Sequence, residues 1–200
     1  MEIPKYLRVI LIAEDSPTQA ENLRYFLERH GYQVVAARNG REAVDLMTKS
    51  KPHLLISDIV MPETDGYELC HFVRADQRLR DLPIIFLSVL SDPADIMKSL
   101  ECGADSFIIK PFQEGPLIDR IQLLLASQSL REHQEKTEPI EVVFHGQKYR
   151  VNADRLKIMN LLASTYEAAV EQKPQLRQAQ KELKAQGRSW QGSIGSFARP

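Results

Sequence analysis

Residues 9–31 read VILIAEDSPTQAENLRYFLERHG, and this stretch contains the pattern that decides the fold. A short apolar run, Val9–Ala13, is followed by polar residues and then by a segment in which Leu23 and Leu27 recur at helical spacing. Gly31 ends that segment, as glycine commonly does after a helix. The stretch therefore predicts a buried strand followed by an amphipathic helix.

The same strand–helix unit recurs until residue 126. The predicted strands are Val9–Ala13, Val34–Ala36, Leu54–Ser57, Ile84–Ser88 and Phe107–Ile109. The predicted helices are Thr18–His30, Arg41–Lys49, Tyr67–Ala75, Ala94–Cys102 and Gly115–Ala126. Short runs that are apolar on both faces are typical of parallel strands covered by helices on both sides. The alternation predicts an α/β fold with a doubly wound, five-stranded parallel sheet.

Composition excludes several other classes of protein. The chain has 200 residues, of which 43% are hydrophobic and 26% charged, and no apolar run approaches the roughly 18 residues that cross a membrane. The first apolar run ends at Glu14 and Asp15, too soon for a signal peptide. Cys70 and Cys102 show no metal-binding spacing, so we expect reduced, partly buried thiols in a cytoplasmic protein.

The charge is spread unevenly along the chain. Residues 1–125 carry 14 basic and 19 acidic side chains, a net charge of −5, and residues 126–200 carry 12 and 8, a net charge of +4. The difference indicates two regions of different character. The basic region has no aromatic-basic motif or helix-turn-helix pattern, so the sequence gives little support for nucleic-acid binding.

The C-terminal region is predicted to contain a hairpin and a long helix. Residues 127–138 are polar and are predicted to carry the end of the fifth helix into a linker. Within residues 139–186, two strand-like runs, Glu141–Phe144 and Lys148–Val151, precede apolar residues with coiled-coil spacing that Pro174 interrupts. The last segment, residues 187–200, has no periodicity and is predicted to be a disordered tail.

Polar side chains stand at the carboxyl ends of the predicted strands, where doubly wound sheets bind their ligands. Glu14 and Asp15 follow the first strand, Asp58 and Ser88 end the third and fourth, and Lys110 follows the fifth. Taken singly, Asp15 can be a helix cap and Lys110 a solvated charge. Together they are harder to explain, because clustered carboxylates repel one another unless a cation binds, and hard oxygen ligands suit Mg²⁺.

Four stretches, ILIAEDS, LLISDIVMPETDGYEL, PIIFLSVLSD and GADSFIIKPF, closely resemble the receiver domain of two-component response regulators, the CheY-like family. The resemblance runs from about Arg8 to Ala126, and we expect a receiver domain over residues 6–126. It implies a flavodoxin-like (βα)5 fold. It also implies a phosphoacceptor signalling domain, not an enzyme, whose own chemistry is limited to self-phosphorylation and slow autodephosphorylation.

The resemblance also assigns roles to the residues at the strand ends. Asp58 would accept a phosphoryl group from the phosphohistidine of a sensor histidine kinase or phosphotransfer protein. Glu14, Asp15 and Asp58 would hold Mg²⁺ together with the backbone carbonyl of Val60. Lys110 would pair with the phosphoryl oxygens, because the transferred group is negatively charged.

Ser88 and Phe107 are the switch residues that the resemblance implies. Phosphorylated Asp58 would draw the Ser88 hydroxyl toward it, and Phe107 would move into the vacated space, although plain core packing also explains Phe107. The family further implies a cis peptide bond before Pro111. Because Phe107 lacks a hydroxyl group, such a switch would work by packing alone.

Three apolar residues depart from the family's pattern. Val89 replaces a small residue after Ser88, so access to Asp58 is expected to be tighter. Val60 and Leu90 flank the site where some members have polar side chains. Because neither can orient an attacking water molecule, the sequence predicts slow autodephosphorylation.

Several readings of the whole chain stay open. The first is a phosphorelay switch with a homodimer through the receiver face or residues 152–186. Because RLKIMNLLASTYEAAVEQKPQLRQAQKEL resembles the connector after receivers in hybrid histidine kinases, the second is the receiver fragment of a larger hybrid histidine kinase or cyclase. The third is an interaction module that works without phosphorylation. A transcription factor would need a DNA-reading domain, which a hairpin and one helix do not supply.

Overall fold

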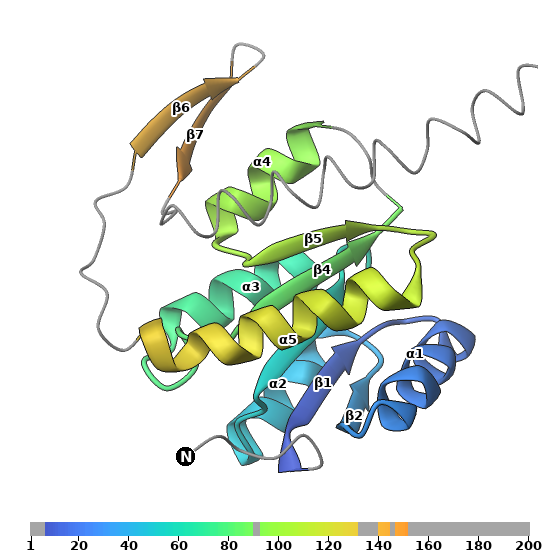
Figure 1. Ribbon diagram of the computed structural model, residues 1–200. Coiled ribbons are helices and arrows are strands. Elements are labelled where there is room, and N and C mark those ends of the chain that lie inside the picture. Colours follow the sequence, from blue (N-terminus) through green and yellow to red (C-terminus); the bar gives the residue numbers. More distant parts are fainter. Residues whose placement is uncertain (1–6, 90–92, 132–139, 145–146, 152–200) are drawn as a thin grey trace, which may run out of the picture. The chain divides into compact units, whose positions relative to one another are not determined.

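The computed structural model describes residues 7–89, 93–131, 140–144 and 147–151 (Figure 1). By its contacts the chain divides into two units, Met1–Ser164 and Thr165–Pro200, and every described residue belongs to the first. The long helix predicted within residues 152–186 and the tail predicted for residues 187–200 lie outside the described residues.

A parallel sheet of five strands forms the centre of the described fold, in the order β2-β1-β3-β4-β5. The strands are β1 (Val9–Ala13), β2 (Gln33–Ala37), β3 (Leu54–Asp58), β4 (Ile84–Ser88) and β5 (Ser106–Ile109). The predicted doubly wound α/β fold is therefore confirmed, with strand bounds that differ from the prediction by at most one residue. The order reverses between β1 and β3, so the carboxyl ends of these two neighbours form the switch point of the sheet.

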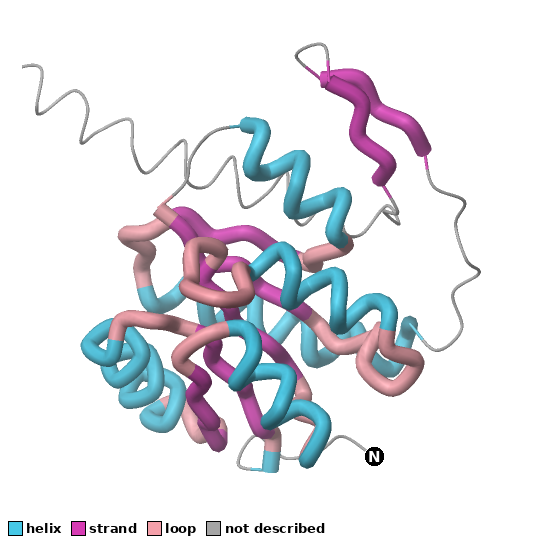
Figure 2. The backbone as a smooth tube through the Cα atoms, turned by 180° about the vertical axis from the view of Figure 1, so that it is seen from behind, coloured by secondary structure: helices cyan, strands magenta, loops and turns pink. Residues whose placement is uncertain are grey.

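Helices cover both faces of this sheet (Figure 2). They are α1 (Pro17–Arg29), α2 (Gly40–Lys49), α3 (Gly66–Ala75), α4 (Pro93–Cys102) and α5 (Glu114–Arg131). Apolar residues of α1 and α5 share one buried cluster with one face of the strands, and those of α2, α3 and α4 share the other. Burial on both faces explains why the central strands are almost continuously apolar.

The edge strand β2 departs from the sequence pattern, and the helix α5 runs past Ala126 into the segment expected to hold its end. β2 lies at the edge of the sheet, so its residues alternate between exposed and half-buried, and Val35 is 39% exposed. The predicted burial on both faces therefore fails for this strand. α5 continues to Arg131, so segment 127–138 begins with the end of the fifth helix, as expected, and the rest of that segment lies outside the described residues.

A two-stranded antiparallel hairpin follows, made of β6 (Ile140–Phe144) and β7 (Gln147–Val151). Both strands were predicted, and the structure adds one residue to the start of each. The Lys148 ammonium pairs with the Glu141 carboxylate at 2.6 Å across the hairpin. The turn residues 145–146 lie outside the described part of the chain.

The two cysteines are buried and neither forms a disulfide, as expected for reduced thiols. The Cys70 thiol donates to the backbone carbonyl of Cys102 at 3.1 Å, which joins α3 to the end of α4. A hydrogen bond with Cys70 and burial both raise the pKa of the Cys102 thiol. Because the thiolate is the reactive form, the raised pKa makes Cys102 a packing residue, and Cys70 lies in the same buried cluster.

A close backbone contact fixes the turn that follows Asp58. The Gly66 amide donates to the carbonyl of Ile59 at 2.9 Å, and Asp65 caps α3 in a reciprocal capping box with Glu68. A Cβ atom added to Gly66 would lie 2.4 Å from the Asp58 carbonyl oxygen and 2.9 Å from the Ile59 Cα. Only glycine lets α3 begin this close to the end of β3.

We expect Gly66→Ala to lower the free energy of unfolding by at least about 2 kcal/mol, because the new methyl group meets backbone atoms that cannot move aside alone. Gly115→Ala is the matched control, since no atom lies within 4 Å of an added Cβ there. It should stabilise the chain by up to about 1 kcal/mol. Urea unfolding of both variants measures the difference, and equal stability would contradict this account of Gly66.

Candidate functional site

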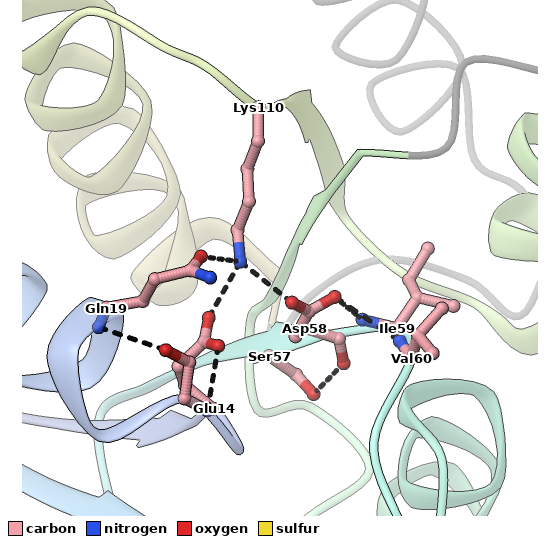
Figure 3. Close-up of polar contacts among 8 residues, drawn as sticks. Glu14, Gln19, Ser57, Asp58, Ile59, Val60 and Lys110 are labelled. Atoms are coloured by element: carbon pink, nitrogen blue, oxygen red, sulfur yellow. Dashed lines mark hydrogen bonds and ion pairs between the residues drawn. The ribbon is translucent and has the colours of Figure 1, made fainter.

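The ammonium group of Lys110 is the centre of a polar cluster at the carboxyl edge of the sheet (Figure 3). Its Nζ donates to Glu14 Oε2 at 2.7 Å, to Asp58 Oδ2 at 2.7 Å and to Gln19 Oε1 at 2.8 Å. These partners come from the end of β1, the end of β3 and the first turn of α1. The structure therefore brings together residues that lie up to 96 positions apart in the sequence.

The Lys110 ion pairs are largely shielded from solvent. The side chains of Lys110, Glu14 and Asp58 are 12%, 3% and 14% exposed. Burial lowers the pKa of the Lys110 ammonium, but hydrogen bonds to Asp58 and Glu14 outweigh it, so the pKa is raised above its ordinary value. Lys110 is thus a fixed positive charge at neutral pH.

The two oxygens of the Asp58 carboxylate have different surroundings. Oδ1 accepts from the backbone amides of Ile59 at 2.6 Å and Val60 at 3.3 Å. Oδ2 faces the ammonium of Lys110. The Asp58 carboxylate is therefore held in one orientation, with Oδ1 bonded to backbone amides and Oδ2 to the Lys110 ammonium.

Glu14, Asp15 and Asp58 form the acidic group that the sequence predicted. Oxygen atoms of these three carboxylates all lie within 4.8 Å of one another. Lys110 balances one of the three negative charges, so the group keeps an excess of negative charge. Hard oxygen donors with an uncompensated charge fit a divalent cation such as Mg²⁺.

The other predicted residues lie around this cluster. Ser88 is fully buried at the end of β4, and its backbone carbonyl accepts from the Lys110 amide at 2.7 Å. Phe107 is 1% exposed and pairs in register with Phe86, which fits core packing and does not test its predicted switch role. The Lys110–Pro111 peptide bond is cis, as the resemblance implied.

Two of the three apolar residues predicted beside the site, Val60 and Val89, are exposed to solvent. Val60 is 60% exposed and Val89 is 70% exposed. Leu90 lies outside the described residues. The expectation that Val89 narrows access to Asp58 stays a prediction. The expectation that Val60 and Leu90 slow the autodephosphorylation of Asp58 also stays a prediction.

Gln19 is the site residue that sequence reasoning missed. It lies one helical turn after Asp15, in the turn that Ser16 caps, and this spacing was the available signal. Gln19 and Lys110 also line a cavity of about 440 Å³ whose apolar walls include Leu23, Phe26 and Phe112. The polar cluster therefore borders an open apolar hollow between α1 and the start of α5.

Comparison with known proteins agrees with this geometry. The sequence pattern of the response regulator receiver domain matches residues 10–122. The chain belongs to this family. Its predicted receiver domain is thereby confirmed as a signalling module of two-component systems, a class that is generally not catalytic.

Two solved receiver domains illustrate the likeness. The receiver domain of a signal transduction histidine kinase from Syntrophus aciditrophicus is 47% identical, covers 68% of this chain and 99% of its own, and superposes with a TM-score of 0.58. The receiver domain of a Pseudomonas aeruginosa sensor histidine kinase, described with a magnesium ion coordinated in its active site cleft, is 28% identical. It covers 60% of this chain and 98% of its own, with a TM-score of 0.57.

The curated relatives are longer than the matched receiver. The transcriptional regulatory protein GltR of Pseudomonas aeruginosa is 38% identical over 118 residues, which are 59% of this chain and 49% of GltR. The response regulator Rre1 of Synechocystis is 37% identical over 60% of this chain and 52% of Rre1. The chain thus spans about half the length of these relatives.

Within the described residues, no helix of this receiver-containing chain is long and apolar enough to cross a membrane.

Lys110→Met should make the receiver's acidic group bind Mg²⁺ about tenfold more tightly, because a competing positive charge between Glu14 and Asp58 is removed. Tighter binding means a larger rise in melting temperature on adding Mg²⁺ than in the wild type. Lys98→Met is the control, since Lys98 is 54% exposed and its ion pair among the described residues is with Asp95 of the same helix, α4. An equal rise in Lys110→Met and wild type would contradict the expected competition.

Proposed function

We propose that this chain is a phosphorelay switch in which Asp58 accepts a phosphoryl group from the phosphohistidine of a sensor histidine kinase or phosphotransfer protein. The observation that carries the proposal is the setting of Asp58. Its carboxylate is held by two backbone amides on one side and by the Lys110 ammonium on the other, beside Glu14 and Asp15. That arrangement orients a carboxylate nucleophile and surrounds it with groups suited to phosphoryl chemistry.

In the proposed transfer, an Asp58 carboxylate oxygen forms a bond to phosphorus while the bond between phosphorus and the donor's imidazole nitrogen breaks. The imidazole leaves with the electron pair of that bond and takes up a proton from solvent. The Lys110 ammonium, already 2.7 Å from Asp58 Oδ2, is placed to pair with a phosphoryl oxygen. Positioning and electrostatic stabilisation supply most of what such a transfer requires.

Mg²⁺ fits the acidic group in this proposal. Glu14, Asp15, Asp58 and the backbone carbonyl of Val60 would hold it. When bound, it would neutralise charge on the phosphoryl oxygens. The carboxylate oxygens within 4.8 Å of one another support this assignment, and so does the magnesium ion described in the cleft of the Pseudomonas receiver.

The signal would leave the site through Ser88 and Phe107. Phe107 pairs in register with Phe86, and the Phe86 ring stands edge-on to Tyr67 with centroids 5.6 Å apart. The Tyr67 hydroxyl donates to the Asp95 carbonyl of α4 at 3.3 Å. Phe107 and Phe86 also share one buried cluster, so a change in packing at Phe107 would pass through Phe86 and Tyr67 to α4 and alter protein contacts there.

The proposed organisation of the chain connects the receiver to the segments that follow it. A receiver over residues 6–126 would pass its state through the segment 127–138 to the hairpin and helix of residues 139–186, with residues 187–200 as a tail. A homodimer through the receiver face or residues 152–186 is the output that the chain itself could provide. We expect the protein to act in the cytoplasm.

Acetyl phosphate with Mg²⁺ should add one phosphoryl group to the purified wild-type chain, and Asp58→Ala should abolish the addition. Asp45→Ala removes an exposed carboxylate of α2 and should be phosphorylated like the wild type. Intact-mass measurement reads the adduct, and sedimentation reads any change in association. Equal phosphorylation of Asp58→Ala and wild type would refute Asp58 as the acceptor.

The phosphoryl group should persist for minutes or longer after the donor is removed, because Val60 cannot orient an attacking water molecule. Val60→Asn introduces an amide beside the site and should shorten the half-life at least threefold. Val35→Asn, at the exposed edge strand β2, is the matched control and should leave it unchanged. A wild-type half-life of seconds would contradict the slow hydrolysis.

A second candidate is that these residues are the receiver of a larger hybrid histidine kinase or cyclase. The 47% identity to a receiver from a histidine kinase favours it, together with the connector-like segment after residue 152. An interaction module that works without phosphorylation is the remaining alternative. Partner binding that is the same for wild type and Asp58→Ala, with and without acetyl phosphate, would favour that module over both phosphorylated forms.

A further inference from the structure

Among the three described side chains that accept from the Lys110 ammonium, Gln19 is the neutral one (Figure 3). An ammonium group has three N–H donors, and Glu14, Asp58 and Gln19 accept one each at 2.7–2.8 Å. Gln19 must present its carbonyl oxygen here, because the amide nitrogen cannot accept a hydrogen bond. The orientation of its side chain is therefore fixed by chemistry as well as by distance.

The start of α1 holds Gln19 in place. Ser16 is the N-cap of α1, and its hydroxyl oxygen accepts a hydrogen bond from the backbone amide of Gln19 at 3.5 Å. The Ser16 amide in turn donates to Glu14 Oε1 at 3.2 Å. Gln19 and Glu14 are thus connected through one short turn, and both face Lys110 from the β1 side of the site.

The charges of the three acceptors would matter once a cation is bound or Asp58 is phosphorylated. A cation held by the acidic group would compete with Lys110 for the carboxylates of Glu14 and Asp58, and phosphorylation would replace the charge of the Asp58 carboxylate with that of the phosphoryl oxygens. The first change would weaken the contacts of Glu14 and Asp58 with Lys110, and the second would move one Lys110 contact from the carboxylate to the phosphoryl group. The amide oxygen of Gln19 carries no net charge, so it would keep its hydrogen bond while competing less strongly than a carboxylate with the phosphoryl oxygens for the Lys110 ammonium.

We propose that Gln19 is a positioning residue for Lys110, which keeps the ammonium directed at the phosphoryl group when Glu14 and Asp58 engage the cation. This inference rests on the proposed function, since it concerns the same phosphorylated site. It identifies α1 as part of the phosphoryl-binding arrangement. The neutrality of residue 19 is part of the role, because a carboxylate there would hold Lys110 back from the incoming phosphoryl group.

Substitution of Gln19 should not disturb the fold. Its side chain is exposed and lines the open cavity beside α1, so other unbranched side chains fit there. Gln19→Met has nearly the same length and no strong acceptor. Gln19→Glu has the acceptor and adds a negative charge. Thr18→Val, at an exposed position in the same helical turn, is the matched control.

The experiment uses two readouts on the full chain. The first is the hydrogen exchange of the Lys110 ammonium by ¹H–¹⁵N NMR without a phosphodonor, with the signal assigned by its loss in Lys110→Met. The second is the rate of phosphorylation by acetyl phosphate at saturating Mg²⁺, read by intact mass. Melting temperatures of all variants check that the fold is kept.

Gln19→Met should speed ammonium exchange at least twofold and slow phosphorylation about threefold to tenfold, as expected for one hydrogen bond to a charged group at a partly exposed site. Gln19→Glu should slow ammonium exchange and also slow phosphorylation. Thr18→Val should match the wild type in both. A helix-stabilising role alone would change the melting temperature and leave the ammonium exchange of Gln19→Met unaltered.

The inference is overturned if Gln19→Met phosphorylates within threefold of the wild type, or if its rate falls without a change in ammonium exchange. A Gln19→Glu variant that phosphorylates as fast as the wild type also overturns it, because neutrality would then be irrelevant. A wild-type chain that takes up no phosphoryl group refutes the proposed function itself. That outcome is distinct, because the wild type alone decides it.

Discussion

The half-buried ammonium group of Lys110 links the carboxylates at the carboxyl ends of β1 and β3. Lys110 follows β5, at one side of the sheet, and reaches the carboxylates that follow β1 and end β3. Without an opposite charge, the Glu14 and Asp58 carboxylates, which are 3% and 14% exposed, would repel each other with little solvent to screen them. The ammonium therefore makes the acidic group compatible with a stable fold, and it leaves enough negative charge for a divalent cation. In the proposed function, the same contact places a positive charge beside the carboxylate that would accept the phosphoryl group.

The backbone around this contact is arranged so that the three side chains meet. The reversal of strand order places β1 beside β3, which brings Glu14 and Asp15 next to Asp58. The close approach of Gly66 to the Asp58 carbonyl starts α3 immediately after the loop that holds Asp58 Oδ1. The backbone amide of Lys110 donates to the Ser88 carbonyl, so the backbone after β5 is bonded to the end of β4.

Much of this could be predicted from the sequence, and the failures have physical causes. The strands, the helices and the gathering of Glu14, Asp15, Asp58 and Lys110 at one edge follow from hydrophobic periodicity and from the geometry of parallel sheets. The exposure of Val35 was missed because an apolar run does not reveal whether its strand lies at the edge. The end of α5 was only approximately placed, because the residues after Ala126 are polar. Gln19 was missed because its partner lies 91 residues away, and only the folded chain shows which polar side chain of α1 faces Lys110.

The central claim is that this cluster makes Asp58 the phosphoacceptor, and chemical mapping of the phosphorylated residue tests it most directly. The full chain would be phosphorylated with Mg²⁺ by a phosphohistidine-bearing phosphotransfer protein, reduced with borohydride to convert an acyl phosphate into an alcohol, and analysed by peptide mass spectrometry. The account predicts that the conversion occurs at Asp58 and that Glu14 and Asp15 stay intact. Conversion at another carboxylate, or none while the donor loses its phosphoryl group to the chain, would contradict it.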